Sequence, residues 1–135
     1  MFFEWQKSNF GKIFANKQTW HDGFFIYNFF TSFTLLLFVW GEVVWVMFAL
    51  NNASFLTLHY SIYFGVDWLG DVYNFLVFSG IATFIFLVNF LMAIAFYAKR
   101  RLLSRFLSAS ASLILLFLLI ATSLIIYINW NNPGL

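Results

Sequence analysis

The sequence predicts an all-α integral membrane protein with three transmembrane helices and a short N-terminal interfacial helix. Of its 135 residues, 63% are apolar and only 9% are charged, whereas soluble proteins are roughly a quarter charged. Three apolar runs, at 24–50, 73–97 and 106–130, each reach the roughly 20 residues that a helix needs to cross the hydrocarbon core. Because backbone polar groups cannot stay unpaired in lipid, these runs are expected to be helical.

Positively charged residues predict the topology of the chain, because Lys and Arg are retained on the cytoplasmic side. All seven fall before the first run or in the turn at 98–105: Lys7, Lys12, Lys17, Lys99, Arg100, Arg101 and Arg105. The loop at 51–72 and the tail at 131–135 contain no Lys or Arg. We therefore expect a bacterial cytoplasmic (inner) membrane location, with the N-terminus inside and the C-terminus outside. The turn residues are also expected to contact anionic lipid head groups.

The first 22 residues form a separate cytoplasmic arm of what is otherwise a single membrane domain. Phe3, Phe10, Ile13 and Phe14 recur at near-helical spacing, which favours a helix lying on the inner leaflet. Gly11 interrupts this pattern. A frayed or partner-bound arm is therefore the alternative.

Glu42 is a carboxyl group inside the first apolar run, where an ionised side chain costs at least roughly 2–3 kcal/mol near mid-bilayer. On a helical wheel it shares one arc with Asn28, Thr31 and Ser32, so this arc is expected to face protein or water. Two interpretations stay open: a proton-titrating or cation-binding carboxylate, or a hydrogen-bonded Glu that locks helices together.

The outer loop at 51–72 holds the densest mixture of polar and aromatic residues in the chain. We expect it to fold back onto the membrane surface or to dock against a partner, with Gly65 and Gly70 as turn points. Its candidate interaction residues are His59, Tyr60, Tyr63, Gly65, Asp67 and Trp68. The spacing of His59, Asp67 and Asp71 matches no established metal-ligand pattern, so a structural role is favoured for them.

The segment 58–67 resembles a His-Tyr-Asn-Ile-Tyr-Phe-Gly-Ile-Asp stretch of small three-span bacterial membrane proteins of unknown role. This chain has Ser61 in place of the asparagine. The loop is more distantly similar to the Pro-x-His-x-Asn loop of bacterial toxin-immunity membrane proteins. The resemblance covers about a tenth of the chain and implies a three-span bacterial protein, with His59, Tyr60, Gly65 and Asp67 as its signature.

Composition and motifs leave two classes of function. The absence of cysteine excludes disulfides, thiolate metal sites and covalently attached haem, and no cofactor or nucleic-acid partner is expected. No catalytic motif is present, so an enzyme is not expected. The first hypothesis is an accessory or scaffold subunit, whose partners are membrane lipids and other membrane subunits or further copies of itself. The alternative is an oligomeric proton- or cation-coupled channel or transporter that uses Glu42.

Overall fold

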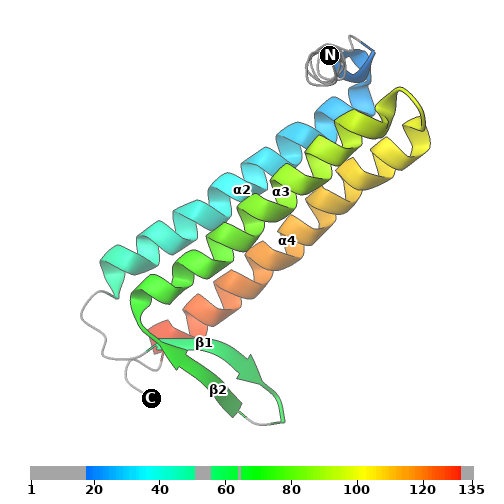
Figure 1. Cartoon of the computed structure of the whole chain (residues 1–135). Helices are drawn as coiled ribbons and strands as arrows, with labels where there is room; N and C mark the ends of the chain where they lie inside the picture. Colours follow the sequence, from blue (N-terminus) through cyan, green and yellow to red (C-terminus); the bar gives the residue numbers. More distant parts are fainter. Residues whose placement is uncertain (1–17, 51–55, 64, 132–135) are drawn as a thin grey trace, which may run out of the picture.

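The protein is a bundle of three long helices that run side by side (Figure 1). The computed structural model describes residues 18–50, 56–63 and 65–131, except for the side chains of residues 60, 61 and 66–68. The helices are α2 (Gly23–Ala49), α3 (Leu76–Tyr97) and α4 (Arg101–Asn131), with short 3-10 turns η1 (Thr19–His21) before α2 and η2 (Val72–Phe75) before α3. All three are long and apolar enough to cross a membrane, which confirms the predicted fold class. The predicted interfacial helix falls mainly on residues 1–17, outside the described residues.

The connection between α3 and α4 is shorter than the predicted turn at 98–105. The backbone N–H groups of Lys99 and Arg100 both donate to the carbonyl of Phe96, at 3.1 and 2.8 Å, and close a tight turn. α4 then begins at Arg101, so Arg101 and Arg105 lie on the helix instead of in a loop. Arginine is a good helix former, and an apolar run marks only the lipid-buried part of a helix that can extend beyond it.

The predicted outer loop contains a short β-hairpin, an element that we did not predict from the sequence. Strand β1 (Leu56–Ser61) pairs antiparallel with β2 (Gly65–Gly70), with irregular register beside His59. Leu56 and Leu58 alternate along β1 and are both buried, as expected for a strand with one apolar face. Gly65 has φ of 73°, a conformation that favours glycine, and it begins β2 directly after the turn.

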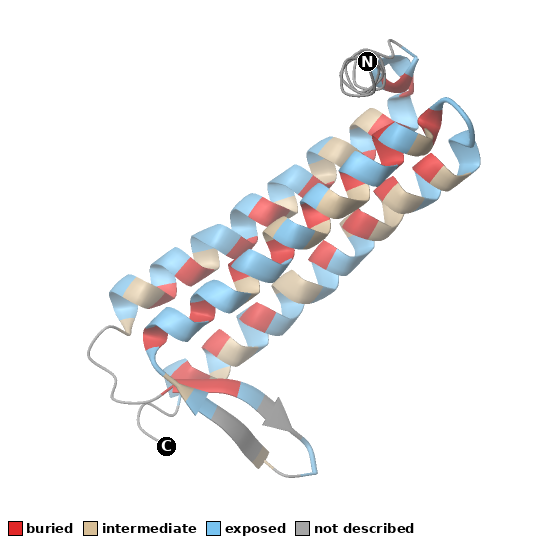
Figure 2. Ribbon diagram, in the orientation of Figure 1, coloured by how far each residue is buried: buried red, intermediate tan, exposed pale blue. Residues whose placement is uncertain are grey.

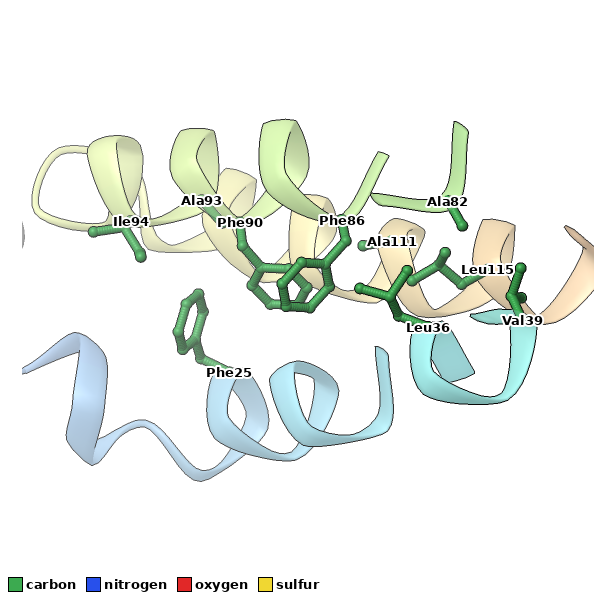
Figure 3. Close-up of a cluster of buried hydrophobic side chains, with 10 residues drawn as sticks. All are labelled: Phe25, Leu36, Val39, Ala82, Phe86, Phe90, Ala93, Ile94, Ala111 and Leu115. Carbon is green, nitrogen blue, oxygen red and sulfur yellow. The ribbon is translucent and has the colours of Figure 1, made fainter. Parts of the chain in front are cut away.

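Aromatic and small residues fill the inner part of the bundle. Figure 3 shows Phe25 of α2 beside Phe90 of α3. The two rings meet edge to face with centroids 5.8 Å apart, and Phe86 packs against Phe90 with centroids 5.0 Å apart. Small side chains are fully buried where α3 and α4 pack together: Ser79, Ala82, Ala93, Ser104, Ser108 and Ala111. Close backbone approach through small residues is typical of helix contacts in membranes.

A second core cluster joins the hairpin to the adjacent end of the bundle. Its members are buried apolar residues from four elements, α2, β1, η2 and α4: Val43, Val46, Leu56, Leu58, Val72, Phe75 and Ile126. Figure 1 places the hairpin at this end, while the start of α2 and the α3–α4 connection lie together at the opposite end. The basic residues of the connection are therefore a full helix length away from the hairpin.

The outward faces of the helices are apolar as well. Exposed residues alternate with buried ones along each helix (Figure 2), and the exposed ones include Phe30, Phe84 and Phe117. A surface of this kind is unfavourable in water but is the expected surface of a helix bundle in lipid.

Candidate functional site

Two separate polar clusters join α2 to α4. One contains Asn28 and Ser32 and the other contains Glu42, although the helical wheel placed these residues on one arc. In the cluster nearer the start of α2, the hydroxyls of Ser32 and Ser112 lie 2.8 Å apart. Ser112 Oγ also lies 3.2 Å from both the backbone and the side-chain oxygen of Asn28. Asn28 and Ser32 are buried. Thr31 is half-buried, and within the described part of the chain its side chain is not hydrogen-bonded to this cluster.

Glu42 forms the second cluster with two hydroxyls of α4. Thr122 Oγ1 donates to Glu42 Oε2 at 2.6 Å, and Ser123 Oγ donates to Oε1. Fourteen residues separate Glu42 from Asn28, or about 21 Å along the helix. The structure therefore does not bring Glu42 together with Asn28, Thr31 and Ser32.

An open groove of about 400 Å³ lies beside the Glu42 carboxylate, between α2 and α4. Its lining combines one carboxylate and two hydroxyl groups, those of Ser123 and Tyr127, with apolar and aromatic surface: Glu42, Trp45, Ser123, Ile126, Tyr127 and Trp130. The rings of Trp45 and Trp130 stack with centroids 5.4 Å apart and an interplanar angle of 26°. Glu42 itself is half-buried, so it belongs both to the helix contact and to the groove surface.

The groove contains a carboxyl group and lies far from the described basic residues. Within the described residues, no ion pair involves Glu42. The lining of the groove contains no Lys or Arg. The described Lys and Arg residues all lie at the other end of α3 and α4, at 99–101 and 105. Within the described part of the chain, the partners of the carboxylate are therefore hydroxyl groups and not a cationic side chain.

A polar site of about 430 Å³ lies at the opposite end, lined by Gln18, His21, Asp22, Gly23, Tyr97, Arg101 and Arg105. Asp22 is its centre: one oxygen accepts from Tyr97 Oη and Arg105 Nε, each at 2.9 Å, and the other accepts the N–H of Phe24 and so caps α2. Burial raises the pKa of the Asp22 carboxyl. Hydrogen bonds from Arg105 and Tyr97 and the charge of Arg105 outweigh it, and the net pKa lies below the usual 3.8.

Arg101 and Arg105, which we expected to contact lipid head groups, also bind other residues of the protein. Arg101 donates to Gln18 at 3.0 Å and lies over the Tyr97 ring, 5.7 Å from its centroid. Lys99 and Arg100 are exposed. All four cations are exposed, but Lys99 and Arg100 lie in the connection itself, whereas Arg105 also joins the ends of α2 and α4.

The hairpin brings together the predicted outer-loop residues, although the side chains of Tyr60, Asp67 and Trp68 lie outside the described part of the structure. The backbones of His59 and Trp68 are paired across the two strands. His59 and Tyr63 are exposed. Within the described residues there is no group of three or more His, Asp or Glu side chains that could hold a metal ion.

Asn129 is the main site residue that sequence reasoning missed. Its side chain accepts from Thr57 N–H at 2.6 Å and donates to the Thr57 carbonyl at 2.7 Å, so it pairs with β1 as a neighbouring strand would. Thr122 and Ser123, the partners of Glu42, were missed too. A signal was present, because all three are polar residues within the third apolar run, and polar groups in such a run need partners.

Comparisons with known proteins do not add a family to these observations. The sequence matches no family model and no curated protein, and the fold matches no solved structure.

Proposed function

We propose that this protein is a small non-catalytic accessory or scaffold subunit of a membrane complex. The complex would reside in a bacterial cytoplasmic membrane, with the N-terminus of the chain inside and its C-terminus outside. The observation that carries this proposal is the β-hairpin, which is fixed to the outer end of the bundle and presents an apolar tip. Ile62 and Tyr63 at that tip are 90% and 91% exposed.

The attachment of the hairpin supports a recognition role. Leu56 and Leu58 are buried against the ends of the helices, and Asn129 binds the backbone of Thr57 through both its oxygen and its nitrogen. A loop held in this way loses little conformational freedom when it binds a partner, so more of the contact energy contributes to affinity.

The interior of the bundle supports the same role. Several polar side chains between the helices bond across the helix contacts, as the hydroxyls of Ser32 and Ser112 do and as the Trp40 indole N–H does with Thr83. Groups of this kind fix the packing of helices in a membrane. The exposed hairpin and apolar helix faces then provide contact area for neighbouring subunits.

The test is native mass spectrometry of the tagged chain extracted from its own membrane. We expect a second polypeptide at fixed stoichiometry with the wild type, and loss of that polypeptide with Ile62→Lys, because a charged tip cannot be desolvated at an apolar contact without a large cost. The matched control is Leu102→Lys, since Leu102 is 85% exposed but lies in the first turn of α4, at the other end of the bundle.

Two results would contradict the subunit role. The first is a wild-type spectrum that contains only this chain, as a monomer or as copies of itself. The second is an Ile62→Lys spectrum with the same partner stoichiometry as the wild type.

An oligomeric path for protons or cations is the second candidate, and the position of Glu42 in an open groove favours it. Three helices are too few for a conventional transporter, so this function requires several copies of the chain around a shared path. Flux through proteoliposomes should then disappear with Glu42→Gln. A scaffold should tolerate the same substitution.

A further inference from the structure

We infer that the groove beside Glu42 binds the ammonium head group of a membrane lipid. This site goes beyond the proposed subunit role and does not depend on it. The inference rests on the charge of the groove, its aromatic lining and its depth in the membrane.

Charge complementarity identifies the kind of group that fits. An ionised carboxylate offers about four acceptor positions, and the hydroxyls of Thr122 and Ser123 occupy two of them. Glu42 also lines the groove, where no cationic side chain of the described residues reaches it. An ammonium group in the groove would donate to the remaining positions and neutralise the charge.

The aromatic lining favours an organic ammonium over a bare metal ion. Trp45, Tyr127 and Trp130 line the groove with Glu42, and each is at least half exposed. Aromatic faces attract organic cations, whereas metal ions of the hard type require several oxygen ligands. The groove offers only one carboxylate and two hydroxyls, those of Ser123 and Tyr127, among its lining side chains.

The depth of the groove matches the head-group region. Trp45 and Trp130 lie four residues and one residue before the outer ends of α2 and α4, or within about 6 Å of those ends. Tryptophan is enriched at this level of a bilayer. Glu42, about one turn deeper, lies where the ammonium of a lipid could reach it from the interface.

The apolar surface below the groove provides a path for the acyl chains. Ile120 and Leu116 precede Ser123 by three and seven residues on the same face of α4, and Phe38 precedes Glu42 by four residues on α2. All three are exposed. A lipid can therefore place its head group at Glu42 while its chains follow the helices toward the membrane centre.

The experiment is a titration of the full-length chain in maltoside micelles with dioleoylphosphatidylethanolamine or dioleoylphosphatidylglycerol, read by native mass spectrometry. We expect one saturable adduct with the amine lipid and weaker binding of the glycerol lipid. Glu42→Gln should weaken amine-lipid binding by about tenfold or more, which corresponds to ~1.4 kcal/mol. The glutamine amide can still bond both hydroxyls, so circular dichroism and thermal unfolding should match the wild type.

Tryptophan substitutions provide a second test of the same site. Trp130→Leu should weaken amine-lipid binding roughly 2- to 30-fold, the range expected for loss of a cation–π contact. Trp40→Phe is the control, because Trp40 of α2 is also partly exposed but lies outside the groove and bonds to Thr83 of α3. Its amine-lipid affinity should equal that of the wild type.

The site is disproved if the two lipids bind alike, or if Glu42→Gln binds the amine lipid as tightly as the wild type. A free cation is distinguished from a lipid by proton NMR with choline and its uncharged analogue 3,3-dimethyl-1-butanol. Choline binding that depends on Glu42, without any preference for the amine lipid, would overturn the lipid assignment and make a free organic ammonium the occupant.

Discussion

Replacing Asn129 with leucine should detach the β-hairpin from the bundle while leaving the three helices intact. Asn129 is buried at the end of α4, and both of its polar side-chain atoms bond to the backbone of Thr57. Leucine has a similar size but can neither donate nor accept. Its substitution leaves the N–H and the carbonyl of Thr57 buried without these partners.

The expected magnitude follows from two competing contributions. Each buried backbone group left unpaired costs about 1–3 kcal/mol, which gives about 2–6 kcal/mol for the two groups of Thr57. The hairpin is otherwise attached by two fully buried side chains, Leu56 and Leu58, which contribute about 1.5–3 kcal/mol each. The cost of leaving the two Thr57 groups unpaired is therefore similar to the stabilisation that comes from burying Leu56 and Leu58. The docked hairpin should then no longer be the favoured state.

Hydrogen exchange of the amides at 56–70, measured by mass spectrometry in micelles, tests this expectation. A loss of 2 kcal/mol corresponds to a decrease in protection of roughly 30-fold. Asn131→Leu is the control, because Asn131 is exposed and donates to the Tyr127 carbonyl of its own helix. Unchanged exchange of the hairpin in Asn129→Leu, with helix content also unchanged, would refute the reasoning.

Three further predictions follow from the other contacts. Asp22→Asn preserves the cap on α2 but removes the charge paired with Arg105, and should lower the unfolding free energy by about 1–2 kcal/mol. Since the pKa of Asp22 is depressed in the folded protein, its contribution is present above pH 3.8 and is lost as the pH falls through the folded value. Thermal unfolding from pH 7 to pH 3 should therefore destabilise the wild type more than Asp22→Asn, and parallel pH profiles would contradict this. Ser112→Ala should cost about 0.6–1.7 kcal/mol, and a double-mutant cycle with Ser32→Ala in detergent unfolding should show coupling; strict additivity would argue against the Ser32–Ser112 bond. Gly65→Ala should destabilise the hairpin by about 1 kcal/mol, because alanine is strained at positive φ, and unaltered hydrogen exchange at 56–70 would show that this conformation is not required.

The local sequence was sufficient to predict the three spanning helices. A bilayer imposes a minimum length and an apolar composition on each segment that crosses it, and both can be read from a continuous run of residues. The ends of the helices were less accurate: α4 begins at Arg101 and not at residue 106, because hydropathy marks the lipid-buried part of a helix and not its polar first turn.

The sequence contains a signal for the hairpin, but we expected the segment 51–72 to be a loop that folds onto the membrane surface or docks against a partner. The segment Leu56–Ser61 alternates apolar and polar residues and precedes a glycine at position 65, which is typical of a strand followed by a turn. The apolar character of the neighbouring residues also fitted a loop lying on the membrane surface, so this local pattern did not decide between the two structures.

Which polar groups meet was decided only by the tertiary structure. Glu42 pairs with Thr122, 80 residues away, and Asn129 pairs with Thr57, 72 residues away. The sequence by itself determined that a carboxyl or amide group in an apolar run needs a partner, because lipid offers none. It did not determine the partner, because that depends on how the helices are rotated and shifted against one another, and this in turn is fixed by the packing of many small and aromatic side chains at once.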